Sequence, residues 1–169
     1  MAQRDITNTK THDEIVAAGG SCDIVLCDLA NREDASKVVD RALAIVGRLD
    51  ILVNNGGMLQ RADTVDVKAE EWDYVSQIPY ALLTSQVMNV NLNSLFVICQ
   101  AAGRHFIPRK AGNIINIASL NSYIGGSRVV SYSAAKGAVA TVTKALSNEW
   151  SRHNIRVNAI APGSIATDM

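Results

Sequence analysis

Short apolar runs alternate with longer amphipathic stretches along the 169 residues, a pattern typical of proteins in which strands and helices follow one another. Residues 23–27, 51–53, 113–118 and 155–161 each predict a strand. The run 51–53 is continuously apolar, which predicts a strand buried on both faces, as in a parallel sheet. The pattern therefore indicates an α/β fold.

A helix is predicted directly after the first of these strands. Asn31 can serve as its N-cap, with Asp34 three residues later in a relation resembling a capping box. Gly47 then ends it, because glycine readily adopts the left-handed conformation that closes helices.

Longer helical patterns cover 87–104 and 131–152, and Asp66 can cap a further helix starting near Lys68. The sequence contains neither repeats nor a linker, so we expect one domain over 1–169. Strand–helix–strand units with right-handed crossovers predict a doubly wound, mostly parallel sheet of the Rossmann type.

Three polar clusters follow predicted strands: residues 54–57, Ser119 with its neighbours, and residues 162–167. Ligands of doubly wound sheets bind outside the carboxyl ends of the strands. We therefore expect these clusters to converge on one binding site.

The composition argues against several classes of partner. Lys and Arg number 16 and Asp and Glu 16, so no net charge favours nucleic acid. No run approaches the roughly 20 apolar residues of a membrane span, and the N-terminus has no apolar signal core. Sparse cysteines without a Cys-x-x-Cys pair fit reduced thiols in the cytoplasm. The separated histidines predict no metal site.

Tyr132 and Lys136 are four residues apart on a predicted helix and so share one face. A lysine ammonium beside a phenol favours the phenolate and lowers the tyrosine pKa from about 10, which makes the pair a candidate general acid and base. Ser119, at the end of a strand, could hold a substrate oxygen next to the phenol. Taken alone, the pair could equally be a packing aromatic and a solvated charge.

Further segments come in a characteristic order and spacing with this group. They are Asn54-Asn55-Gly56-Gly57, Asn91 within Val-Asn-Leu, Ser119, Tyr132-x-x-x-Lys136, and Asn158-Ala-Ile-Ala-Pro-Gly163 with Thr167. Together they resemble the short-chain dehydrogenase/reductase family, in its shorter-chain branch. The family motif Asn-Asn-Ala-Gly is present here as Asn-Asn-Gly-Gly.

This resemblance implies an NAD- or NADP-dependent oxidoreductase that interconverts an alcohol and a carbonyl. Tyr132 would donate or accept the proton. Lys136 would lower the tyrosine pKa and hold the nicotinamide ribose, and Ser119 would orient the substrate oxygen. Asn91 would distort its helix and hold a water in a proton relay to Lys136.

The resemblance also implies cofactor contacts, which are Asp28 and Leu29 at the adenine ring, Asn55 near the adenosine ribose with Gly57 in the same motif, Tyr132 and Lys136, and Ile165 and Thr167 on the nicotinamide side. Several of these have a simpler alternative. An acid after a strand, such as Asp28, is a common turn residue. Asn54 and Asn55 could only stabilise a turn, and Gly57 could only permit a tight backbone.

Residues 113–119 and 124–126 are similar to family members that oxidise sugar acids, so a sugar, sugar acid or polyol is the expected substrate class. The helices at 87–104 and 131–152 match those that pair between subunits in the family, which implies a homo-oligomer.

The sequence departs from the family pattern at both ends. No glycine-rich turn precedes the strand at 23–27, and Gly19-Gly20 is instead expected at a helix end. The first strand, most of the second and the last strand of the family sheet have no counterpart, so we expect an incomplete sheet. Strands 23–27 and 51–53 would then either collapse together or leave an open edge. Poor stability and oligomerisation or aggregation are expected.

Residues 76–87 interrupt the family pattern, because their removal joins Val75 directly to Met88 and restores it. Our hypothesis is a translated intron or gene-model error, and the alternative is a genuine insertion. Two functions are therefore weighed for the chain, an active oxidoreductase and a catalytically inactive truncated isoform or fragment that at most associates with full-length subunits.

Overall fold

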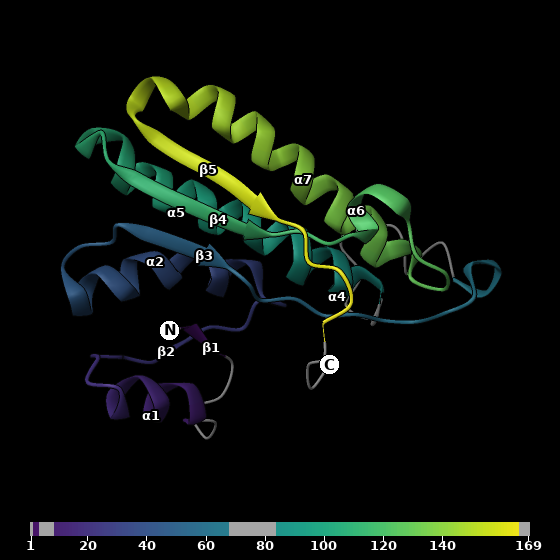
Figure 1. Ribbon diagram of the computed structural model, residues 1–169, viewed down its shortest axis with the longest axis horizontal. Coiled ribbons are helices and arrows are strands. Elements are labelled where there is room, and N and C mark those ends of the chain that lie inside the picture. The colour runs from purple at the N-terminus through teal and green to yellow at the C-terminus, as the bar shows by residue number, and fades with distance from the viewer. Residues whose placement is uncertain (1, 4–8, 68–83, 166–169) are drawn as a thin grey trace.

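The computed structural model describes residues 2–3, 9–67 and 84–165 (Figure 1). Its main sheet consists of β3 (Ile51–Asn54), β4 (Gly112–Ile117) and β5 (Ile155–Ile160), all parallel, in the order β3-β4-β5. A second, two-stranded parallel sheet pairs β1 (Ala2–Gln3) with β2 (Val25–Leu26). These parallel sheets alternating with helices confirm the predicted α/β class.

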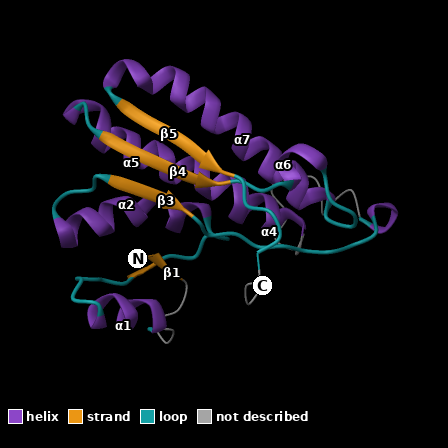
Figure 2. Ribbon diagram, viewed as in Figure 1, coloured by secondary structure: helices purple, strands orange, loops and turns teal. Residues whose placement is uncertain are grey.

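One face of the main sheet carries the principal helices. Figure 2 shows α2 (Arg32–Val46), α5 (Ser94–Arg109) and α7 (Val130–Trp150) on the same side of the three strands. The side chains of Ile114 and Val157 point into this layer and are buried. They are partners in the β4–β5 register, so the sheet and the helices share one hydrophobic core.

The opposite face of the sheet is exposed, and the prediction that residues 51–53 are buried on both faces is wrong. Ile51 is 56% exposed and Val53 53% exposed, and Ile160 on β5 is 54% exposed. Successive side chains of a strand point to opposite faces, so Leu52 packs against the core while its two neighbours do not. In parallel sheets, strands that are apolar on both faces normally have both faces covered by helices.

The two sheets do not join. In the described part of the chain β2 pairs with β1 and β3 pairs with β4, and no ladder links β2 to β3. Of the two expected outcomes, collapse or an open edge, the structure shows the open edge. Leu26 on β2 is half-exposed.

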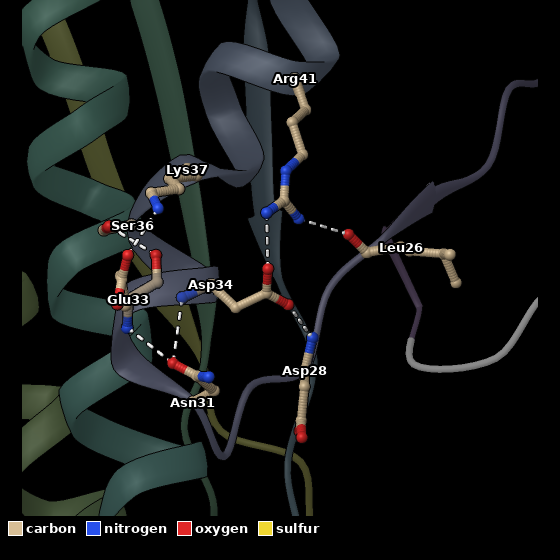
Figure 3. Close-up of polar contacts among 8 residues, drawn as sticks. All are labelled: Leu26, Asp28, Asn31, Glu33, Asp34, Ser36, Lys37 and Arg41. Atoms are coloured by element: carbon tan, nitrogen blue, oxygen red, sulfur yellow. Dashed lines mark hydrogen bonds and ion pairs between the residues drawn. The ribbon is translucent and has the colours of Figure 1, made fainter.

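Helix α2 begins and ends at the predicted residues. The Asn31 side chain accepts hydrogen bonds from the backbone N–H groups of Glu33 and Asp34, at 3.0 and 3.2 Å (Figure 3). Gly47 closes the helix with φ of 72°, in the left-handed region that favours glycine. Both signals act within a few residues, which is why the sequence alone reveals them.

Side chains of the same helix bind the strand β2 and the turn that follows it. The Asp34 carboxylate accepts the Asp28 backbone N–H at 2.6 Å and pairs with Arg41 at 2.6 Å, while Arg41 also donates to the Leu26 carbonyl at 2.8 Å (Figure 3). The Asp28 N–H and the Arg41 guanidinium hold the pKa of Asp34 below its ordinary value of 3.8. These hydrogen bonds connect β2 of the small sheet to α2 of the helical layer.

Helix α1 (Lys10–Ala17) is followed by Gly19 with φ of 82°, so the glycine pair lies at a helix end as predicted. Asp66 lies in the short η1 (Thr64–Asp66), and the helix expected near Lys68 falls outside the described residues. Of the segment 76–87, only 84–87 is described, within α4 (Thr84–Met88).

The two long helical predictions hold with changes at their ends. The first is divided into α4, the π-helical η2 (Asn89–Asn93) and α5, which continues through Arg109. The second is α7, which passes into η3 (Ser151–His153) before β5, and the short α6 (Asn121–Ile124) precedes it. Among the helices of the described residues, none combines the length and the apolar character that crossing a membrane requires.

The uncovered sheet face leads to a first prediction. Exchanging Ile51 and Val53 for threonine keeps the β-branched shape and removes apolar surface, so the variant should self-associate less and bind less of a hydrophobic dye than the parent chain. Size-exclusion chromatography at several concentrations and dye fluorescence measure both effects. The control makes the same exchange at Ile45 and Val46, equally exposed but on α2. Equal behaviour of the two double variants would contradict an associating sheet face.

Candidate active site

The candidate site lies at the carboxyl edge of the main sheet. The strands β3, β4 and β5 all point toward the end of the molecule where α4 and α6 lie (Figure 1). Residues 54–57 leave β3 there, Ser119 follows β4, and the polar segment after β5 begins there. The backbone N–H of Leu120 donates to the Pro162 carbonyl at 2.9 Å, so two of the predicted clusters meet directly.

Lys136 is the buried charge of this edge. Its side chain on α7 reaches across to the end of β4, where Nζ donates to the Ile117 carbonyl at 2.6 Å, and the residue is only 4% exposed. Burial lowers the pKa of Lys136 to about 8 from an ordinary value of 10.5. The group is therefore still mainly an ammonium at neutral pH, but one with a weakened hold on its proton.

Tyr132 lies one turn before Lys136 on the same face of α7, as their spacing predicts. The Lys136 Nζ is 5.8 Å from the centroid of the tyrosine ring, and the tyrosine is half-buried. The two side chains therefore lie side by side on one face of α7.

Ser119 is buried just beyond the end of β4. Its Oγ accepts the backbone N–H of Asn121 at 3.1 Å, and within the described residues its hydroxyl proton has no acceptor. The hydroxyl can therefore donate to a substrate oxygen. The described contacts include no hydrogen bond between Ser119 and Tyr132. A substrate oxygen bound between the two hydroxyls would therefore form a separate hydrogen bond with each of them.

Asn91 sits at the centre of the distorted turn η2, where the resemblance placed a helix distortion. Its Nδ2 donates to the carbonyls of Val87 and Met58, both at 2.8 Å, and its Oδ1 accepts the Met58 N–H at 3.2 Å. The Asn91 side-chain amide thus binds both the backbone N–H and the carbonyl of Met58, the residue that follows the Asn-Asn-Gly-Gly segment. The geometry assigns Asn91 to holding this loop, and its part in a water relay stays a prediction.

At Gly57 that loop passes close to both Asn91 and the Lys136 side chain on α7. A Cβ at Gly57 would lie 2.8 Å from Asn91 Oδ1 and 3.7 Å from Lys136 Nζ. The glycine is required here by close approach and not by an unusual dihedral angle. At Gly56 a Cβ would instead meet only the end of the Leu29 side chain.

A buried polar chain beneath the site was missed by the sequence reasoning. Asn54 Nδ2 donates to Asn116 Oδ1 at 2.8 Å and to Cys99 Sγ at 3.3 Å, and Asn116 Nδ2 donates to Thr143 Oγ1 at 2.9 Å. Desolvation raises the pKa of Cys99 to about 12, so its thiol is a packing group here. The available signal was a pair of asparagines placed within otherwise apolar strands.

The residues expected at the adenine end have partners within the protein. Asp28 Oδ1 accepts the Ala30 N–H at 3.0 Å, which is the turn-forming alternative for this acid. The Leu29 carbonyl accepts the Ser94 hydroxyl at 2.6 Å, and the Leu29 side chain lies over Gly56. These contacts fix the β2–α2 turn against the start of α5 and the loop after β3.

The remaining predicted positions are less engaged. Asn55 is exposed, and Ile165 is 66% exposed. Thr167 lies outside the described residues. The structure therefore brings Asn91 and Gly57 close to the Lys136 side chain, with Tyr132 beside that lysine. In the described ranges, no three His, Cys, Asp or Glu residues are placed to hold a metal.

Comparison with known proteins agrees with this geometry. The sequence profile of the family described as short chain dehydrogenase matches residues 1–169. The chain belongs to the short-chain dehydrogenase/reductase family. It spans about three-fifths of the length of the first curated relatives and solved structures that it matches.

Two curated relatives carry names that specify different reactions. The 2-dehydro-3-deoxy-D-gluconate 5-dehydrogenase of Escherichia coli K12 is 42% identical over 161 residues, which is 95% of this chain and 59% of that protein. The acetoacetyl-CoA reductase of an Acinetobacter species is 39% identical over 145 residues, 86% of this chain and 54% of that protein.

A solved structure shares the fold closely. The gluconate 5-dehydrogenase of Burkholderia cenocepacia J2315, crystallised with NADP and tartrate, superimposes with a TM-score of 0.84 at 31% identity. The match covers 99% of this chain and 62% of that protein. The Rossmann-type arrangement is thereby established for the part of the fold that this chain contains.

A second prediction concerns the two glycines before Met58. Gly57→Ala should destabilise the chain by about 1–3 kcal/mol, because its Cβ must displace the Asn91 amide from its contacts with Met58. Gly56→Ala should cost less, since the end of the Leu29 side chain can rotate away, and the family motif carries alanine there. Chemical denaturation of both variants measures the difference. Equal losses would show that Asn91 does not depend on the bare backbone at Gly57.

A third prediction follows from the buried lysine. Between about pH 8 and 10.5 the unfolded chain keeps the Lys136 proton while the folded chain loses it. Stability therefore rises with pH across this window, by the linkage between proton binding and folding. Lys136→Met removes the titrating group, so the free energy of unfolding of the parent relative to this variant should increase from pH 8 to 10.5. Urea denaturation at several pH values measures both free energies. The same dependence on pH for the parent and for Lys136→Met would contradict the prediction.

Proposed function

We propose that the chain carries the catalytic half of an NAD- or NADP-dependent oxidoreductase that interconverts an alcohol and a carbonyl. The observation that carries the proposal is the Lys136 ammonium, buried at the end of β4 and 5.8 Å from the Tyr132 ring. Burying a charge is costly unless it is paired or hydrogen-bonded. Here the ammonium is hydrogen-bonded to the Ile117 carbonyl and lies beside a phenol.

In the oxidation direction, the Tyr132 phenolate accepts the proton of the substrate hydroxyl. In the reduction direction, the phenol returns that proton to the carbonyl oxygen. The Ser119 hydroxyl, which has a proton to donate, holds the same oxygen and stabilises the charge that develops on it. The Lys136 ammonium lies beside the ring and offsets the negative charge that the tyrosine carries in this step.

The residues present fit the nicotinamide end of such a cofactor. Only one Lys136 hydrogen bond is described, to the Ile117 carbonyl, so two of its three protons are available to ribose hydroxyls. The bare backbone at Gly57 lies beside the same ammonium. When bound, the nicotinamide supplies or accepts the hydride. Contacts by Asp28, Leu29, Asn55, Ile165 and Thr167 belong to the proposal as well.

A sugar acid is the proposed substrate class. Support comes from the Escherichia coli and Burkholderia relatives, whose names specify gluconate-type substrates. The acetoacetyl-CoA reductase at similar identity shows that relatives with other substrates share this part of the chain. The substrate class therefore rests on the named relatives, while the proton chemistry rests on the geometry.

We further propose a homo-oligomer in the cytoplasm, formed through the helices at 87–104 and 131–152. Ala134, Thr141 and Ala145 are exposed on α7, and small residues permit the close approach of a second helix. Phe96 on α5 adds an aromatic side chain to the exposed surface.

A second candidate is a chain that associates with full-length subunits without catalysing a reaction. The exposed apolar side chains of Ile51, Val53 and Ile160 favour it, because such a face is covered in a working parallel sheet. The two candidates differ in one measurable property, which is the binding of the reduced cofactor.

A fourth prediction tests the proposed chemistry. Titration of the purified chain with NADH and NADPH should give saturable fluorescence changes, and a keto sugar acid should be reduced. Tyr132→Phe should lower the rate by at least the 10²-fold typical of a lost general acid, with cofactor binding retained. Lack of binding by the parent chain would support the associating candidate. Binding with a fully active Tyr132→Phe variant would overturn the role of the tyrosine.

A further inference from the structure

Ser122 joins the loop that carries Ser119 to the helix that carries Lys136. Its Oγ donates to the Lys136 carbonyl at 2.8 Å and accepts the Ser119 backbone N–H at 3.2 Å. In return, the Ser122 N–H donates to the Ser119 carbonyl at 2.9 Å. One hydroxyl therefore uses its donor and an acceptor position on two residues of the proposed active site.

The two ends of Lys136 are thereby held by the same short segment. Its Nζ donates to the Ile117 carbonyl at 2.6 Å, and its own carbonyl accepts from Ser122. The segment 117–122 thus contacts Lys136 at both its ammonium and its backbone. A Cβ at Gly137 would lie 3.8 Å from the Ser122 carbonyl, so the α6 turn passes close to α7 at this point.

Ser119 itself depends on this turn for its direction. Its Oγ accepts the Asn121 N–H at 3.1 Å, and Asn121 and Ser122 both belong to α6. The direction of the Ser119 hydroxyl is therefore set by α6, and the place of α6 on α7 is set in part by the Ser122 hydroxyl. Removing this hydroxyl leaves Ser119, Tyr132 and Lys136 chemically intact.

We propose that Ser122 is a positioning residue that keeps the Ser119 hydroxyl in register with Tyr132 and Lys136. The catalytic consequence rests on the proposed function, whereas the positioning itself does not. A net hydrogen bond contributes modestly to stability, so the expected effect of losing it on a rate is about fivefold to tenfold.

The chain offers a matched control in Ser133. Its Oγ accepts the Gly126 N–H at 3.2 Å, so it too links the segment after α6 to α7, yet its hydroxyl has no described hydrogen bond to Ser119, Tyr132 or Lys136. Comparing Ser122→Ala with Ser133→Ala separates a general loosening of this connection from a specific loss of the Ser119 register.

Hydrogen exchange provides the readout that is independent of activity. In Ser122→Ala the amide of Ser119 should exchange faster, because its acceptor is gone, while Ser122→Thr should keep the protection. Ser133→Ala should expose only the amide of Gly126. Unchanged exchange at Ser119 in Ser122→Ala overturns the proposal, even if the parent chain binds no cofactor.

Kinetics provide the second readout where the parent chain turns over. Ser122→Ala should lower kcat about fivefold to tenfold with little change in the KM for NADPH, and Ser122→Thr should restore it. Equal kcat in Ser122→Ala and the parent overturns the proposal, as does an equal loss in Ser133→Ala. Should Ser122→Ala fail to fold, Ser122→Cys takes its place, and its weaker hydrogen bonds should give a smaller change in the same direction.

Discussion

The hydrogen bond between the Lys136 ammonium and the Ile117 carbonyl is the contact on which this site depends. It fixes α7 to the carboxyl end of β4 and places a charge where water is largely excluded. Since the charge is desolvated, its electrostatic interactions are stronger than they would be at the surface. Tyr132 gains its proposed chemistry from this arrangement, and the same burial lowers the pKa of the lysine itself.

Amide and hydroxyl side chains surround this contact and keep the loops in place. Asn91 grips Met58, the chain from Asn54 through Asn116 to Thr143 crosses the sheet into α7, and Ser122 links Ser119 to Lys136. Buried polar groups of this kind are costly unless they are paired, so each pair specifies one arrangement of its two segments. The site is therefore held mainly by directional contacts, while the apolar core behind it supplies the cohesion.

The sheet of this chain is covered by helices on one face only, so the similarity of its fold to its relatives does not by itself establish its activity. The fold superimposes closely on a complete relative over 99% of its own length but covers 62% of that relative. The residues proposed for proton transfer lie within the shared part. The uncovered face of β3 and the unpaired edge beside β2 show that the shared part does not satisfy every surface that its sequence builds.

The sequence by itself determined the order of strands and helices, the limits of α2 at Asn31 and Gly47, and the shared face of Tyr132 and Lys136. These features depend on periodicity and on contacts within a few residues, which a sequence displays directly. Only the tertiary structure decided that Ile51 is exposed and that Ser122 bridges Ser119 and Lys136. Both features depend on which distant segments meet, and no local pattern encodes them.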